Sequence, residues 1–123
     1  MPRRRFDRVN RIYHITSAAE AAEAKHARAS GEYAPQAFAV DGFIHCSYAH
    51  QVCPVANRLF KGRTDLVLFE IDPAKLRSAV IDENLECGND VFPHIYGKLP
   101  MQAVVRVHEF PSSHDGEFQM PEF

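Results

Sequence analysis

The chain has 123 residues, of which 46% are hydrophobic, and its formal net charge at pH 7 is -2. A chain of this size buries roughly two-thirds of its unfolded surface on folding, which allows one domain with one core and excludes a second domain of similar size. The slightly acidic balance gives no general attraction to phosphate backbones, which argues against nucleic acid as a partner.

The ends of the chain and its cysteines indicate an ordinary cytoplasmic protein. The Arg3-Arg4-Arg5 cluster lies in residues 1–9, a stretch typical of a flexible N-terminal tail. Cys46, Cys53 and Cys87 form no CxxC pair, and an odd number of cysteines does not suggest a disulfide framework. No apolar run approaches the ~20 residues that cross a bilayer, and no signal-type segment follows the basic N-terminus. We therefore expect cytoplasmic localisation and no membrane partner.

The first half of the chain alternates between strands and helices. Ser17 and Glu20 have the spacing of a capping box at the head of an alanine-rich helix that should stop near Gly31. Ser47 is a plausible N-cap for a second helix, in which Pro54 predicts a kink or a late start. The predicted elements are a strand over 11–16, the first helix, a loop over 33–40, a strand over 43–46 and a second helix ending near residue 60.

In the second half, the nearly continuous apolar run from Leu66 to Ile71 predicts a central strand that serves as scaffold. After it we expect one helical turn over 74–76, a strand over 78–82, a loop over 84–90, and strands over 91–96 and 103–110. The polar segment from Ser112 to Phe123 is expected to be poorly ordered. The predicted organisation is a tail over 1–9, a single α+β domain over 10–110 and a C-terminal tail over 111–123.

Three of the predicted strands place a histidine among bulky apolar residues: His14, His45 and His94. Alternation along a strand turns each imidazole to the face opposite its apolar neighbours, so the pattern predicts a histidine-lined cleft on a sheet. The competing interpretation gives each histidine a structural or surface role of its own.

The same residues carry a resemblance to the bacterial family called domain of unknown function 952. The motifs that carry it are ordered along roughly residues 10 to 109: Ile12 to Thr16, Gly31 to Tyr33, Asp41 to Ser47, Gln51, Leu66 to Asp72, and Phe92 to Gly97. The family resembles, distantly, the ADP-ribosyltransferase superfamily, whose members bind NAD in a cleft between two small sheets. The resemblance therefore implies an ADP-ribosyltransferase-like α+β fold with a split, mainly antiparallel sheet and two main helices. A fold relation alone does not confer function.

The resemblance also implies roles for particular residues. His14 and Thr16 match a histidine followed two residues later by a small hydroxyl residue on the first strand, and residues two apart share a face. Cleaving the bond between nicotinamide and ribose builds positive charge on the sugar, which calls for a carboxylate beside it. Glu83 is the best candidate, with Asp82 and Glu86 close enough to compete.

His45 stands roughly where the superfamily usually presents a tyrosine, a departure that puts standard ADP-ribosyl transfer in doubt. An imidazole there can act as acid, base or ligand donor. Tyr33 or Tyr96 would flank the nicotinamide, and Ser47 and His94 would complete the predicted cleft.

Three hypotheses follow. The first is an NAD-using ADP-ribosyltransferase-like enzyme that cleaves the nicotinamide–ribose bond, with Glu83 and His45 as catalytic residues and NAD as its cofactor. The alternative is a non-catalytic module that binds a nucleotide or another small metabolite. Ranked lowest is a metal-dependent enzyme using the three histidines, for which the sequence has no diagnostic spacing, so we expect no metal. The sequence does not decide the oligomeric state.

Overall fold

The computed structural model describes residues 11–27, 31–84 and 90–121. Predictions for the tail over 1–9 with its arginine cluster, and for Glu86 and Cys87, concern residues outside these ranges. Every strand pairing in the described part is antiparallel, and the strands form a four-stranded, a three-stranded and a two-stranded sheet. The fold is α+β with antiparallel sheets and few helices, as the sequence indicated.

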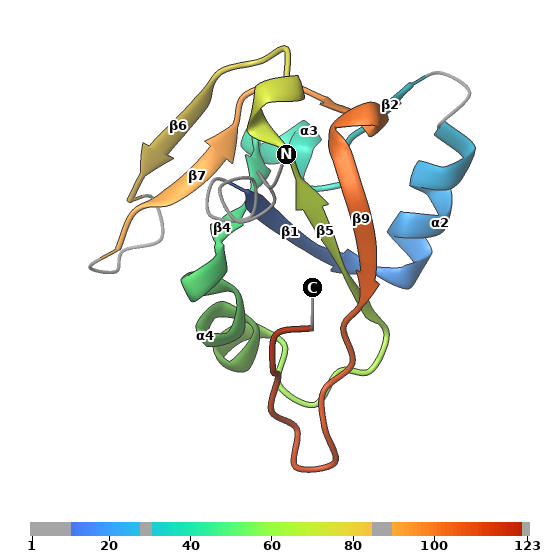
Figure 1. Ribbon diagram of the computed structural model, residues 1–123, viewed down its shortest axis with the longest axis vertical. Coiled ribbons are helices and arrows are strands. Elements are labelled where there is room, and N and C mark those ends of the chain that lie inside the picture. The colour runs from blue at the N-terminus through green and yellow to red at the C-terminus, as the bar shows by residue number, and fades with distance from the viewer. Residues whose placement is uncertain (1–10, 28–30, 85–89, 122–123) are drawn as a thin grey trace, which may run out of the picture.

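The four-stranded sheet has the order β4-β1-β5-β9 (Figure 1). Its strands are β1 (Ile12–Ser17), β4 (Ser47–Tyr48), β5 (Leu66–Ile71) and β9 (Val104–Glu109). The central position predicted for β5 is confirmed, since β5 pairs with β1 on one side and β9 on the other. β1 pairs with β5 along its whole length but with β4 only at Ile12 and Tyr13. The edge of β1 from His14 to Ser17 therefore lacks a β4 partner, and this edge positions the site.

The three-stranded sheet has the order β3-β7-β6. It consists of β3 (Ile44–His45), β7 (Phe92–Ile95) and β6 (Val80–Glu83), and His45 lies directly opposite His94 in its register. The strand predicted over 43–46 is shorter, since β3 covers Ile44–His45. The Cys46 N–H still donates to the Pro93 carbonyl, and the chain then enters the four-stranded sheet as β4, which was not predicted. The two-stranded sheet pairs β2 (Glu32–Tyr33) with β8 (Leu99–Pro100).

Helix α2 (Ala18–Ala27) begins as predicted, because the Glu20 N–H donates to Ser17 Oγ at 3.1 Å. Helix α4 (Ala49–Leu59) contains Pro54, and its N-cap is Tyr48 rather than the predicted Ser47. The Gln51 side chain accepts from the Tyr48 N–H at 3.0 Å and fixes that start. A helix that the sequence analysis missed, α3 (Phe38–Asp41), lies in the predicted loop. Two short 3-10 helices complete the elements, η1 (Pro73–Lys75) and η2 (Met101–Ala103).

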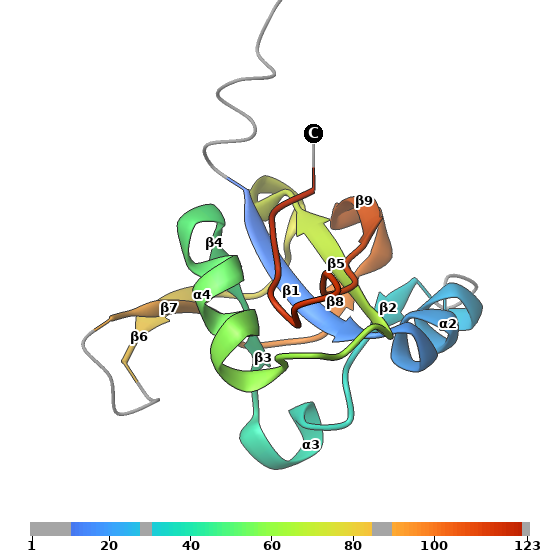
Figure 2. The same ribbon diagram turned by 90° about the horizontal axis from the view of Figure 1, so that it is seen from below.

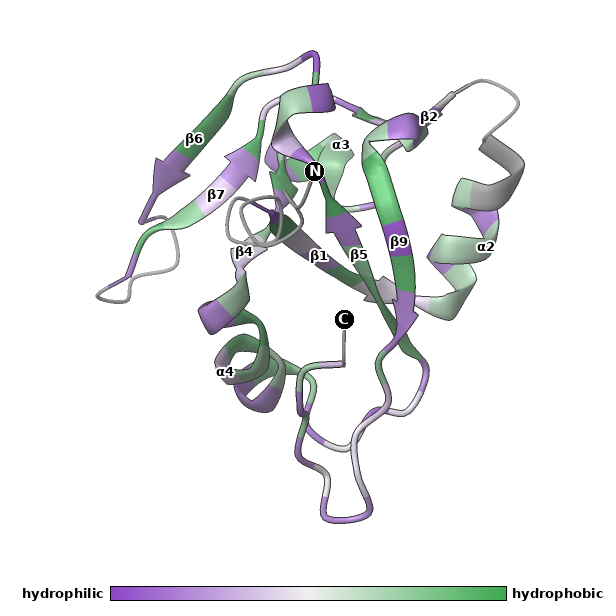
Figure 3. Cartoon of the chain, viewed as in Figure 1, coloured by the Kyte–Doolittle hydropathy of each residue, from purple (hydrophilic) through white to green (hydrophobic). Residues whose placement is uncertain are grey.

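Two hydrophobic clusters pack on the four-stranded sheet, because alternate residues of β1 and β5 point to opposite faces. Ile12 and Phe69 belong to the cluster that extends to the smaller sheets, while Tyr13 and Leu68 belong to the cluster under α4. Figure 3 shows the hydrophobic residues that run along the inner strands. The α4 cluster forms one wall beside the unpaired edge of β1.

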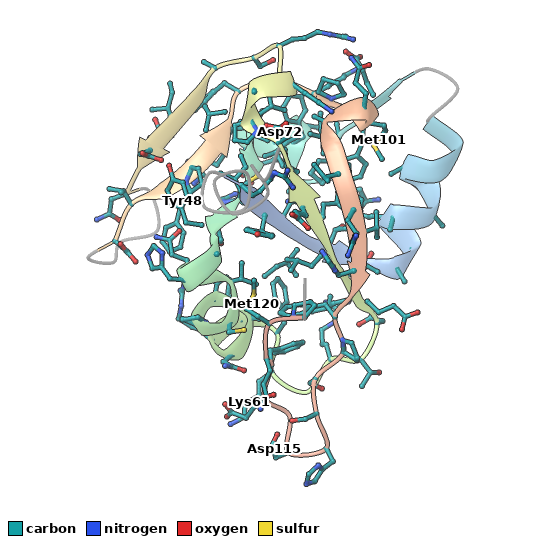
Figure 4. The ribbon with its side chains drawn as sticks, viewed as in Figure 1. Tyr48, Lys61, Asp72, Met101, Asp115 and Met120 are labelled. Atoms are coloured by element: carbon teal, nitrogen blue, oxygen red, sulfur yellow. The ribbon has the colours of Figure 1, made fainter. Side chains whose placement is uncertain are left out.

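The C-terminal segment corrects a prediction. The sequence analysis expected poor order from Ser112 onward, but Phe118 is 3% exposed and its ring centroid lies 5.0 Å from that of Phe110. Its N–H donates to Asn57 Oδ1 on α4 at 2.8 Å, and Met120, labelled in Figure 4, packs against the same cluster. A few apolar residues in a polar segment are enough to anchor it, which a composition-based interpretation misses.

Replacing Phe118 tests this anchor. Phe118→Ala should lower the free energy of unfolding by about 3 kcal/mol, because it deletes a buried ring from a packed cluster. Urea unfolding measures the change, and the exposed neighbour in Gln119→Ala is the control. Equal stability of the two variants would show that the segment is not part of the core.

Candidate functional site

A cavity of about 490 Å³ lies along the unpaired edge of β1. Its volume falls within the roughly 300–1,000 Å³ that is typical of small-molecule sites. One wall is the last turns of α4 with the turn that follows, and the other is the segment from Pro35 to Ser47. Of the residues that the sequence predicted for the cleft, His14, Thr16, His45 and Ser47 line it.

His14 is held between the two sheets. Its Nδ1 lies 2.7 Å from the main-chain oxygen of His45, and because a carbonyl only accepts, Nδ1 carries the proton and donates. Burial lowers the pKa of His14 to about 4, outweighing the bond to His45, which raises it. The imidazole is therefore neutral at pH 7, and its Nε2 is an acceptor that lies 3.3 Å from the Tyr33 hydroxyl.

The Tyr33 hydroxyl connects three residues of the cavity wall. It lies 3.2 Å from Thr16 Oγ1 and 3.2 Å from Glu20 Oε1, in addition to its contact with His14. Burial is the main cause that raises the pKa of Tyr33, so the phenol keeps its proton. Tyr33 does not line the cavity but stands behind the residues that do.

Glu20 is one of several cavity residues that were not predicted for the site, and Arg58 and Arg63 are others. Glu20 was recognised only as part of the capping box, yet it lines the cavity and contacts Tyr33. Its position four residues after Thr16, across the junction from β1 to α2, was the available signal. Both side chains contact the Tyr33 hydroxyl, because α2 begins at Ala18, directly after β1.

Glu83, His94 and Tyr96 form a polar cluster beside the cavity, here called the second cluster. His94 Nδ1 lies 3.0 Å from Glu83 Oε1, and the Tyr96 hydroxyl donates to the same oxygen at 2.6 Å. These two bonds, that from Tyr96 first, lower the pKa of Glu83. Phe43 lines the cavity and stacks on His94 with ring centroids 4.2 Å apart. The ring of His45 lies 5.2 Å from that of His94, so the second cluster is separated from the cavity by one layer of rings.

The residues predicted for a single cleft are therefore divided between the cavity and the second cluster. Glu83, His94 and Tyr96 belong to the second cluster and are not in the cavity wall. His94 and Tyr96, on and just beyond β7, bond to Glu83 on the neighbouring β6. Phe92 shares their face of β7 and does line the cavity, so strand alternation alone does not separate the two groups. Asp82, which competed with Glu83, instead accepts a bond of 2.6 Å from the Tyr48 hydroxyl.

The metal hypothesis finds no set of ligands among the described residues. Both nitrogens of His14 are engaged by His45 and Tyr33, and within the described ranges no group of three His, Cys, Asp or Glu side chains is placed to hold a metal ion. The Cys46 thiol is no alternative nucleophile, since burial raises its pKa.

One further buried ionic group lies in β5, which the sequence analysis treated as scaffold. Glu70 accepts from Arg11 at 2.7 Å and lies 2.9 Å from His108 Nε2. None of these three residues lines the cavity. In the described part of the chain, no helix is long and apolar enough to span a bilayer.

Acidification should destabilise the fold through His14. Its pKa is about 4 in the folded protein and about 6.5 in the unfolded chain, so between these values the unfolded chain binds more protons and stability falls as the pH falls. The expected loss is about 3 kcal/mol between pH 7 and pH 4. His14→Asn keeps a donor for the His45 carbonyl and does not titrate, so its urea unfolding should lack this pH dependence. The same pH dependence in the variant would assign the effect to other groups.

Comparison with known proteins identifies relatives over most of the chain. The family model described as "Protein of unknown function (DUF952)" matches residues 18–107. The X-ray crystal structure of Protein CC0527 from Caulobacter crescentus is similar with a TM-score of 0.73 and 32% identity, covering 89% of this chain and 93% of that chain. Its solution NMR structure gives a TM-score of 0.73 and 32% identity, over 89% and 92%. No curated protein matches. From the sequence motifs, the family match and the shared fold together, the chain belongs to the DUF952 family of proteins of unknown function.

Proposed function

We propose that the protein binds an NAD-type nucleotide in the cavity beside β1. The observation that supports this is the joint placement of His14 and Thr16 in the wall of a cavity of about 490 Å³. These two residues are the pair that resembles the NAD-binding pattern of the ADP-ribosyltransferase superfamily. His45 and Ser47 face them from the segment that crosses between the sheets.

The chemistry of the wall fits a nucleotide. Thr16 and Ser47 supply hydroxyl groups of the kind that hold ribose hydroxyls. Phe43 and Phe92 supply aromatic faces for a planar ring. Arg58 lines the cavity as well, and a guanidinium matches the geometry of a phosphate. A largely apolar cavity with a few convergent polar groups is the usual form of a cofactor site.

Cleavage of the nicotinamide–ribose bond is a second candidate, which one observation favours. His45 lines the cavity, carries an imidazole of the kind that serves as an acid or a base in enzymes, and lies against His94, which Glu83 holds at 3.0 Å. Bound NAD would supply the bond to be broken. Glu83 would act on the cavity through the two histidine rings rather than by direct contact, so binding without chemistry is the function that the geometry supports best.

Binding can be tested by thermal stability. A ligand that binds only the folded protein stabilises it by about 2.7 kcal/mol at a hundredfold excess over its Kd, so NAD or ADP-ribose should raise the Tm. Thr16→Val removes one hydroxyl of the cavity at constant shape and should reduce that rise. Thr64→Val makes the same change at an exposed threonine outside the cavity and should not. No rise in the wild-type Tm with millimolar NAD, ADP-ribose or related nucleotides would end the NAD proposal.

Chemistry can be tested separately with Glu83→Gln. The change keeps the size of the side chain and removes its charge, so nucleotide binding should persist while any release of nicotinamide falls by about tenfold or more. Glu109→Gln on β9 is the matched control. A wild-type protein that binds NAD but releases no nicotinamide would leave a binding module, and unchanged release in Glu83→Gln would remove Glu83 from the reaction.

A further inference from the structure

Two groups of opposite charge face the cavity from different helices. Glu20 belongs to the first turn of α2, and Arg58 belongs to the last turn of α4. Figure 2 shows these helices on opposite sides of β1, whose unpaired edge runs along the cavity. A ligand that fills the cavity would therefore meet a different charge on each side.

The Glu20 side is rich in hydrogen-bond acceptors. His14 Nδ1 gives its proton to the His45 carbonyl, which leaves Nε2 as an acceptor. The Tyr33 hydroxyl has one proton and lies within 3.3 Å of that Nε2 and 3.2 Å of Glu20 Oε1, so it cannot donate to both. Thr16 Oγ1 is a third partner of the same hydroxyl, so at least one of the acceptors His14 Nε2 and Glu20 Oε1 lacks its proton. Both residues line the cavity, and Glu20 has a second carboxylate oxygen that can accept from a donor on the ligand.

The Arg58 side is cationic. Arg63 also lines the cavity, but Asp65 accepts two bonds from its guanidinium, at 2.8 and 2.6 Å, and offsets its charge. Arg58 forms no ion pair with any residue of the described ranges, so its charge is available to a ligand. An anionic group on the ligand is best placed here.

We infer that the cavity selects a nucleotide whose base end donates hydrogen bonds to Glu20 and His14 and whose phosphate pairs with Arg58. This inference rests on the proposed function and deepens it, because it names the half of the dinucleotide that the polar groups recognise. A pyridine nucleotide with a carboxamide meets both requirements. The same nucleotide with a carboxylate in place of the carboxamide puts a negative charge against Glu20 and leaves the acceptors without donors, which is how polar sites reject close analogues.

Three probes separate the two ends. Nicotinamide mononucleotide has both the carboxamide and the phosphate, nicotinic acid mononucleotide replaces the carboxamide by a carboxylate, and nicotinamide riboside lacks the phosphate. By isothermal titration calorimetry on the full chain, we expect the first to bind at least about tenfold more tightly than either of the others.

Matched variants assign each preference to its residue. Glu20→Gln should bring the two mononucleotides to within about threefold of each other, and Arg58→Gln should do the same for nicotinamide mononucleotide and the riboside. Glu23→Gln on α2 and Arg106→Gln on β9 change exposed residues outside the cavity and should keep both preferences.

The outcomes distinguish this inference from the proposed function. Equal affinity of the wild-type protein for the carboxamide and carboxylate nucleotides would overturn the inference, as would binding of NAD without binding of any of the three probes; both leave nucleotide binding intact. No binding of NAD, ADP-ribose or the probes would overturn the proposed function itself. If Glu20→Gln fails to fold, the ratio of the two mononucleotides on the wild-type protein still decides.

Discussion

The bond of 2.7 Å from His14 Nδ1 to the His45 carbonyl joins the two larger sheets, and the candidate site depends on it. β4 pairs with β1 only at Ile12 and Tyr13, so the next residues of β1 have β5 on one side and no strand of that sheet on the other. The imidazole of His14 bridges to the crossing segment in place of a ladder bond. Because the two segments are joined through a side chain rather than a backbone ladder, space remains along the strand edge, and that space is the cavity.

Burial keeps the imidazole of His14 neutral, and this determines how the bond to His45 affects the rest of the site. An imidazole that is neutral at pH 7 presents one donor and one acceptor, and the donor is used by the carbonyl. The acceptor then competes with Glu20 for the single proton of Tyr33. A structural bond between sheets thus also determines the hydrogen-bonding character of one side of the cavity.

The parts of the fold that sequence reasoning predicted are those with strong local signals. The apolar run of β5 and the Ser17–Glu20 cap are specified by neighbouring residues, and both were found. Strands β2 and β8 have two residues each and acquire their structure by pairing across the molecule, so they carry no periodicity of their own. Phe118 shows the same limit, since its burial depends on α4, which is about sixty residues away in sequence.

The site was predicted where motif and strand geometry agreed, as for His14 with Thr16 and His45 with Ser47. It was not predicted where the orientation of a side chain depended on a partner strand. Glu83 lies opposite Phe92 in the register, and Phe92 lines the cavity while Glu83 turns to His94 and Tyr96. The bonds to His94 and Tyr96, and not the register of β6 with β7, therefore hold the carboxylate outside the cavity wall.

The cavity and the second cluster therefore share Phe43 and His45 as a common wall, while the carboxylate of Glu83 lies on one side of it and that of Glu20 in the cavity on the other. Phe43 and His45 face the cavity and also contact the ring of His94. Asp41 Oδ2 lies 2.9 Å from His45 Nε2, so a ligand that displaces His45 would disturb its contact with this carboxylate on one side and with the ring of His94 on the other. The nucleotide binding that we propose would therefore not need the second cluster, and His45 is the titratable side chain that lies between the cavity and His94.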